Sequence, residues 1–121
     1  MMTCLYVFLG AGLGGVSRYG LSTWLNGAAT LGKFPIGIFA CNLIGCFLIG
    51  LVFALQKESA PAWLNPLLVT GFLGGFTTFS SFGLDTFKLY DAGHHSTALL
   101  YVLTTIIGSL VALSLAIKII R

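Results

Sequence analysis

Charged residues are so rare in this chain that they divide it into long uncharged stretches, and these stretches constrain the fold more than any other feature. Six Lys and Arg and three Asp and Glu make up 7% of the 121 residues, whereas a soluble domain carries about 25%. No charged side chain occurs in residues 1–17, 34–56, 59–84 and 96–117. Because about 20 apolar residues cross the core of a bilayer, the sequence excludes a water-soluble monomer. It predicts an all-α integral membrane protein with four transmembrane helices.

These helices use almost the whole chain and leave no room for a soluble domain. We expect a single transmembrane domain over residues 1–121, with helices at about 2–26, 34–56, 63–88 and 96–118. Pro35, Pro61 and Pro66 lie near the expected helix starts, where proline is tolerated. The first apolar run lacks a preceding Lys or Arg and a following A-x-A pattern, so we expect it to be retained rather than cleaved as a signal peptide.

The loops are expected at residues 26–33, 57–62 and 88–95, so the chain changes sides at each of them. The basic residues then divide equally: Lys57, Lys118 and Arg121 on the side of the N-terminus, and Arg18, Lys33 and Lys88 on the other. The positive-inside rule gives no preferred orientation for such a count. Two interpretations stay open. Either the chain inserts both ways and forms an antiparallel, dual-topology dimer, or one charge decides a weak preference.

Several functional classes lose support from the composition. The net charge of +3 reflects few acids rather than a basic stripe, so we expect no nucleic-acid partner, and lipid headgroups are the plausible polyanionic neighbours. Cys4, Cys41 and Cys46 lack C-x-x-C or zinc-ligand spacing and are interpreted as small packing residues. No set of nucleophile, base and orienting residue is present, so the sequence predicts no enzyme.

A glycine pattern near the N-terminus imitates a dinucleotide-binding turn. Gly10, Gly12 and Gly15 match G-x-G-x-x-G, but no acidic residue follows about twenty positions later and no strand pattern surrounds them. Gly10 and Gly14 are better interpreted as small residues that allow two membrane helices to approach closely.

The third apolar stretch contains a Gly pair and a Thr pair near its middle, in the run 71–83, GFLGGFTTFSSFG. Glycine and β-branched residues disfavour a continuous helix, so we expect the helix to unwind at about residues 74–78. Carbonyls freed at membrane depth must be buried or coordinated, for example by a monovalent cation that an antiparallel dimer would share on its axis. The alternative is a kink satisfied by Thr and Ser hydroxyls.

Two polar side chains lie in apolar surroundings. The amide of Asn42, near the middle of the second helix, must bond either another helix or a ligand. Arg18 is the one charge of the first helix and is either an interfacial anchor or a positive group at the mouth of an anion path. Asp85 and Lys88 are expected to form a solvated ion pair, and the adjacent His94 and His95 to be solvated in a loop.

Aromatic and hydroxyl side chains form two helical stripes. Phe79 and Phe82 share a face with Phe76, and their ring edges carry partial positive charge that can stabilise an anion, although such stripes usually serve packing. The last helix carries hydroxyls at i, i+4 and i+8, which indicate a polar track unless they bond back to their own helix: Tyr101, Thr105 and Ser109.

Taken together, these residues resemble the Fluc (CrcB) family of fluoride channels. The resemblance spans all four helices and is carried by Gly37 and Asn42, by the run 74–82, GGFTTFSSF, and by Gly108-Ser109. It implies an antiparallel dual-topology dimer with two anion pores and a central structural sodium ion. It also implies residence in the bacterial inner membrane.

The resemblance further implies a role for each position that matches the family pattern. The backbone carbonyls of Gly74 and Thr77 would bind sodium, and Arg18 would lie in a vestibule. The pore would be lined by Asn42, Phe79, Phe82, Tyr101, Thr105 and Ser109. The chain departs from the pattern at Ile38, where a Thr is usual, and at Leu113, where the pattern predicts another hydroxyl. These departures affect the outer ends of the expected pore.

The implied function is passive, selective export of cytoplasmic fluoride, which reduces fluoride toxicity. A first alternative is a proton-coupled exporter of the small multidrug resistance type, but such proteins need a glutamate deep in the first helix, where this chain has none. A second alternative is a purely structural membrane assembly subunit.

Overall fold

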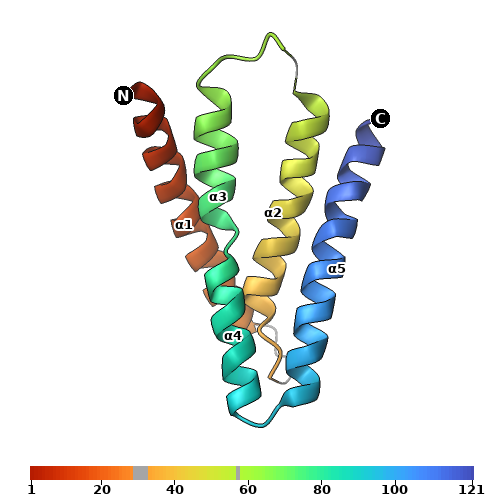
Figure 1. Ribbon diagram of the computed structural model, residues 1–121. Helices are drawn as coiled ribbons and strands as arrows, with labels where there is room; N and C mark the ends of the chain where they lie inside the picture. Colours follow the sequence, from red (N-terminus) through yellow and green to blue (C-terminus); the bar gives the residue numbers. More distant parts are fainter. Residues whose placement is uncertain (29–32, 57) are drawn as a thin grey trace.

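The computed structural model describes residues 1–28, 33–56 and 58–121, and every regular element in these ranges is helical (Figure 1). In chain order the elements are α1 (Met2–Ala28), α2 (Ile36–Leu55), the π-helix η1 (Asn65–Leu73), α3 (Gly74–Phe76), α4 (Phe79–Asp91) and α5 (His95–Ile120). Both termini lie at one end of the molecule, and the link from α4 to α5 lies at the other (Figure 1). Parts of two expected loops, residues 29–32 and Lys57, lie outside the described residues.

Three helical runs are long and apolar enough to cross a membrane: Ile36–Leu55, Asn65–Asp91 and His95–Ile120. The chain is therefore a multi-pass membrane protein. α1 has 27 residues, which exceeds the length a span requires. Its glycines and Arg18 make it less apolar than the other three runs.

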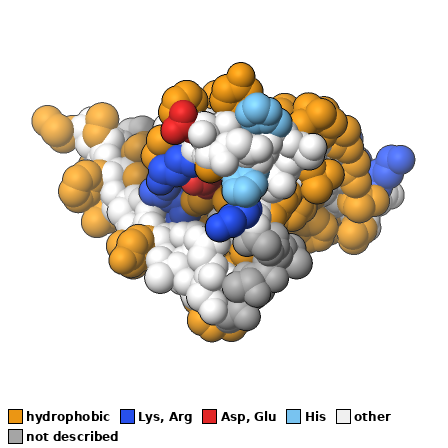
Figure 2. Space-filling model, turned by 90° about the horizontal axis from the view of Figure 1, so that it is seen from below, with side chains coloured by type: hydrophobic (Ala, Val, Ile, Leu, Met, Phe, Trp, Pro, Cys, Tyr) orange, Lys and Arg blue, Asp and Glu red, His pale blue; other side chains and the backbone are white. Residues whose placement is uncertain are grey.

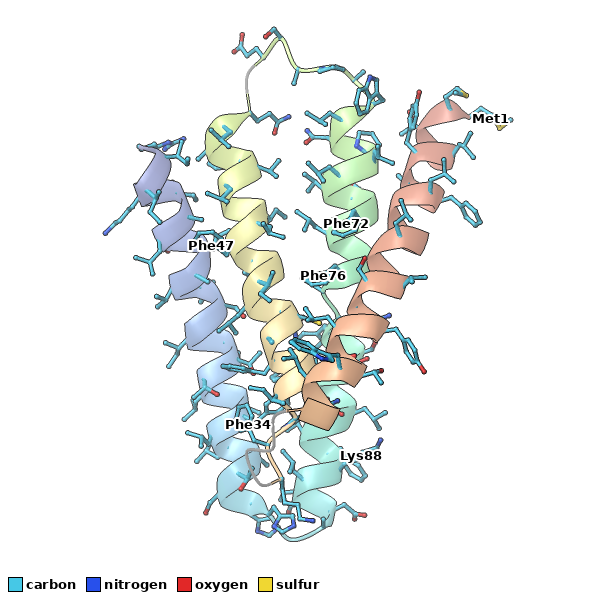
Figure 3. All side chains as sticks on the ribbon, turned by 180° about the vertical axis from the view of Figure 1, so that it is seen from behind. Met1, Phe34, Phe47, Phe72, Phe76 and Lys88 are labelled. Carbon is cyan, nitrogen blue, oxygen red and sulfur yellow. The ribbon has the colours of Figure 1, made fainter. Side chains whose placement is uncertain are left out.

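Small residues bring α1 against η1 and α3. A Cβ atom on Gly10 would overlap the Leu67 carbonyl oxygen, and one on Gly14 would overlap that of Phe72. The prediction that these two glycines allow close helix approach is confirmed. In these two elements, the side chains of Phe72 and Phe76 stack with ring centroids 5.9 Å apart (Figure 3).

The η1 segment differs from the α-helix that the sequence predicts there. Its turns are wider, and the Gly74 N–H that follows it donates to the Val69 carbonyl five residues back. Gly71 permits this winding, because a Cβ there would come within 2.9 Å of the Pro66 carbonyl oxygen. Such wide turns interrupt the usual i→i−4 ladder and are common at functional sites.

The end of α4 also differs from expectation, since the helix runs through residue 88 to Asp91. The Lys88 carbonyl still accepts the Ala92 N–H at 3.0 Å. Gly93 then adopts a φ of 88°, a left-handed conformation that suits glycine and ends the helix. The loop is therefore shorter than the expected 88–95. His95 is the first residue of α5, and its ring stacks on that of Tyr90 with centroids 4.5 Å apart.

The buried core lies where α4 and α5 meet. Phe82 and Tyr101 pack with ring centroids 5.1 Å apart, and Leu89 and Ala98 complete the cluster. Ile38 packs against this cluster. α2 runs beside α5, so α2, α4 and α5 surround one region of the molecule, with α1 on the far side of η1 (Figure 1).

Candidate functional site

Two threonines separate α3 from α4. Thr77 and Thr78 have extended backbones, with φ/ψ of −93°/149° and −150°/123°, a conformation that β-branched side chains favour. The Thr77 hydroxyl donates to the Leu73 carbonyl at 2.9 Å, and Thr78 Oγ1 accepts the Ser81 N–H at 3.3 Å. The helical run is thus interrupted inside residues 74–78, the interval in which the sequence predicts unwinding.

Asn42 of α2 replaces the hydrogen bonds that Thr78 loses at this break. Its Oδ1 accepts the Thr78 N–H at 3.0 Å, and its Nδ2 donates to the Thr78 carbonyl at 3.3 Å. A side-chain amide has two N–H groups, and within the described residues only one of them has an acceptor. Asn42 therefore connects two helical runs and still has one donor to offer.

Carbonyl oxygens at the break have lost their usual donors, among them those of Gly74 and Thr77. In a continuous helix the Thr78 N–H would reach the Gly74 carbonyl, but here it donates to Asn42. The Ser81 N–H would likewise reach the Thr77 carbonyl, but it donates to the Thr78 hydroxyl. Within the described part of the chain, no other donor to these two carbonyls is found. Bare carbonyl oxygens at membrane depth fit the ligand chemistry of a hard monovalent cation.

A groove of about 340 Å³ opens beside the break, between α2, α4 and α5. It is lined by Asn42, Cys46, Thr77, Thr78, Phe79, Phe82, Thr105, Ile106, Ser109 and Leu110. Asn42, both phenylalanines of the expected pore and the last two hydroxyls of the expected polar track are thereby brought together. On α5 the groove ends at Leu110, so Leu113 lies beyond it.

Two hydroxyls in this groove have no partner. Thr105 Oγ1 and Ser109 Oγ are both buried, and neither forms a hydrogen bond within the described residues. Thr104, one position earlier on α5, behaves differently, because its hydroxyl donates to the Leu100 carbonyl at 2.6 Å. The back-bonding that the sequence left open for Thr105 and Ser109 is therefore absent. An unpaired buried hydroxyl costs about 1–3 kcal/mol, so a partner that accepted hydrogen bonds from these two groups would recover that cost.

The two phenylalanines of the groove differ in exposure. Phe82 is 7% exposed and belongs to the core, whereas Phe79 is 84% exposed. Their ring centroids lie 5.8 Å apart with planes tilted by 59°, so the two rings are in contact without stacking face to face. Phe79 thus borders the open side of the groove and Phe82 its floor.

Tyr101 does not line the groove, although the sequence places it on the hydroxyl stripe. It is fully buried, and its hydroxyl donates to Asp85 Oδ2 at 3.5 Å. Its ring packs edge-on against the Phe34 ring, with centroids 5.3 Å apart. It also contacts the Phe82 ring in a tilted arrangement, with centroids 5.1 Å apart. Asp85 therefore has Tyr101 as its partner, rather than forming the solvated pair with Lys88 that the sequence predicts.

Arg18 turns inward from α1. Its Nη1 donates to Ser81 Oγ at 3.5 Å, just beyond the break on α4, and its Nε is buried without a partner in the described residues. An arginine serving only as an interfacial anchor would extend to the headgroups. The guanidinium is instead held near the break, on the α1 side.

Three residues at this site were missed by sequence reasoning: Cys46, Thr78 and Ser81. Cys46 follows Asn42 by four positions, and this spacing on one helix face could have identified it. Thr78 and Ser81 stand in the quoted run, but their partners come from α2 and α1, 36 and 63 residues away.

Comparison with known proteins identifies the class to which this membrane protein belongs. A family model described as CrcB-like protein, Camphor Resistance (CrcB), matches residues 5–117. Because this match covers nearly the whole chain, the chain belongs to the CrcB-like family.

Curated relatives are covered over most of their length, and three of them have the same name. The fluoride-specific ion channel FluC of Paracoccus denitrificans is 47% identical, over 91% of this chain and 87% of the relative. The protein of the same name from Coxiella burnetii is 46% identical over 87% of this chain and 86% of its own. That from Methylobacterium nodulans is 40% identical over 100% and 98%. These relatives are named as channels rather than enzymes.

Proposed function

We propose that this chain is a fluoride-specific ion channel of the bacterial inner membrane. The observation that carries the proposal is the groove beside the helix break, where the Asn42 amide, two phenylalanine side chains and two hydroxyls without a partner in the described residues line one space. The names of the relatives support fluoride as the ion. The function requires no catalytic group, because a channel conducts down a gradient.

The lining of the groove suits a small, strongly hydrated anion. Asn42, Thr105 and Ser109 would replace water as hydrogen-bond donors, and the edges of Phe79 and Phe82 would stabilise charge without holding it tightly. Binding must be favourable enough for entry and weak enough for exit. Export would follow the inside-negative membrane potential, which contributes about 2.3 kcal/mol per charge per 100 mV.

We infer that α1 is the fourth membrane span and that a second copy in the opposite orientation completes the pore. Phe79 is 84% exposed and the groove is open on its side, so one copy leaves the pathway unlined there. Of the basic residues in the described part of the chain, Lys118 and Arg121 belong to the end with the termini, Lys33 and Lys88 belong to the opposite end, and Arg18 lies within α1. Two reporters can be fused to the C-terminus in separate experiments, one active only on the cytoplasmic side of the membrane and one active only on the opposite side. Both should give signal. A single active reporter would contradict the dual topology.

A structural sodium ion is the proposed ligand of the break. The Gly74 and Thr77 carbonyls would hold it, together with their counterparts from the second copy, and it would satisfy oxygen atoms that have lost their helical donors. Dimer stability measured by size-exclusion chromatography should then fall when sodium is replaced by N-methyl-D-glucamine. An unchanged dimer would refute this role.

Conduction can be tested in liposomes loaded with potassium fluoride. After valinomycin is added to clamp the potential, a fluoride electrode should record rapid release, and a parallel chloride experiment should record almost none. A folded protein that releases no fluoride would overturn the proposal. It would return the exporter and the structural subunit as candidates.

A further inference from the structure

A second groove lies away from the helix break, at the end opposite to the termini. Its volume is about 470 Å³, and it runs between the start of α2 and the first turns of α5. It is lined by Lys33, Phe34, Ile36, Phe39, Thr97, Leu100 and Thr104. No residue of this groove belongs to the proposed fluoride path.

Most of this groove is apolar. Leu100 is 54% exposed, and Phe34 and Phe39 pack edge to face at 5.1 Å along its α2 side. The Thr104 hydroxyl is already used, because it donates to the carbonyls of its own helix. A surface of this kind on a membrane-spanning helix pair suits a hydrocarbon chain better than water or a polar solute.

The end of the groove is basic. Lys33 also lines a smaller hollow of about 260 Å³, together with Lys88, His94 and Asp85. Asp85 is half-buried and accepts the Tyr101 hydroxyl, and Asp91 is exposed at the end of α4 outside the hollow, so within the hollow two exposed lysines face one half-buried carboxylate. Figure 2 shows lysine or arginine and histidine side chains gathered at this end, with acidic side chains beside them, and Figure 3 places Lys88 and Phe34 there, far from Met1.

We propose that this groove binds an anionic phospholipid. The phosphate would lie beside Lys33 and Lys88, and one acyl chain would follow the apolar lining toward Leu100. Basic pockets between membrane helices recognise anionic headgroups in this way. The inference rests on the chain spanning a membrane and is independent of which ion the protein conducts.

The test is native mass spectrometry of the purified protein with phosphatidylglycerol or phosphatidylcholine. The wild-type protein should retain phosphatidylglycerol in preference to phosphatidylcholine. Lys33 is exposed, so Lys33→Gln should fold normally and weaken phosphatidylglycerol binding about fivefold, the effect of roughly 1 kcal/mol per basic residue. Leu100→Trp should fill the groove and reduce retention of the lipid.

Two controls stand at matched positions. Lys118→Gln removes a lysine at the other end of α5, and Leu99→Trp adds an indole beside the groove rather than in it. Both should retain phosphatidylglycerol as the wild type does. The proposal is overturned if Lys33→Gln binds phosphatidylglycerol like the wild type. It is also overturned if glycerol 3-phosphate competes as well as the intact lipid, because the acyl chain would then contribute nothing.

Discussion

The two sides of the helix break are built in opposite ways. On the α1 side, helices approach so closely that a Cβ atom on Gly14 would overlap the Phe72 carbonyl, and one on Gly75 would lie 2.5 Å from the Ala11 carbonyl oxygen. On the groove side, Phe79 is 84% exposed, and the Thr105 hydroxyl is buried with no partner in the described chain.

This difference separates positioning from function. Backbone packed against backbone has no rotamers to adjust, so the α1 side fixes where the break lies. The groove side keeps donors unpaired, which reduces stability but leaves them for an ion. Changes on the first side should therefore affect folding before conduction, and changes on the second should affect conduction before folding.

The largest effect is expected from Gly14→Ala. Its new Cβ would meet the Phe72 carbonyl, which cannot move without separating α1 from η1, so we expect a loss of about 3 kcal/mol in stability. Thermal unfolding in detergent, followed by size-exclusion chromatography, measures this loss. Gly12→Ala is the matched control, because nothing lies within 4 Å of a Cβ at that position. Equal stability of the two variants would show that close packing does not position the break.

Asn42→Ala should have the next largest effect, because Asn42 both holds the break through Thr78 and lines the groove. Removing its amide leaves the Thr78 N–H and carbonyl unpaired, so we expect a loss of about 2 kcal/mol in stability, at about 1 kcal/mol per hydrogen bond. Fluoride efflux should also fall. A variant that unfolds like the wild type would show that the Asn42–Thr78 bonds are unimportant for the break.

The break could be predicted from the sequence because its cause is local. Glycine and threonine disfavour helix through their own backbone and side-chain preferences, so residues 74–78 carry the signal themselves. The hydroxyls of α5 follow from helical periodicity in the same way. Tertiary partners leave no such local signal. The hydrogen bonds between Thr78 and Asn42 span 36 residues. The orientation of the Tyr101 side chain toward Asp85 depends on how α4 packs on α5.

Phe79→Ile tests the groove side alone. Phe79 is largely exposed within the chain, so the substitution should change the stability of the isolated fold little. If ring edges stabilise the ion by up to about 1.5 kcal/mol, fluoride efflux should fall about tenfold. Phe82→Ile, at a residue only 7% exposed, should lower both stability and efflux. Intact fluoride flux in a stable Phe79→Ile protein would show that the pore assignment is wrong.

Thr105→Val gives the smallest and most discriminating effect. Valine has nearly the same shape as threonine and removes a buried hydroxyl that has no partner within the described residues, so stability should stay the same or rise by up to about 1 kcal/mol. Efflux should nevertheless fall about fivefold, because about 1 kcal/mol of donation to the ion is lost. Thr104→Val is the control, since that hydroxyl bonds its own helix and Thr104 does not line the groove beside the break. Only a hydroxyl kept for an ion predicts a protein that becomes more stable and conducts less, whereas a hydroxyl that merely packs predicts no change in efflux.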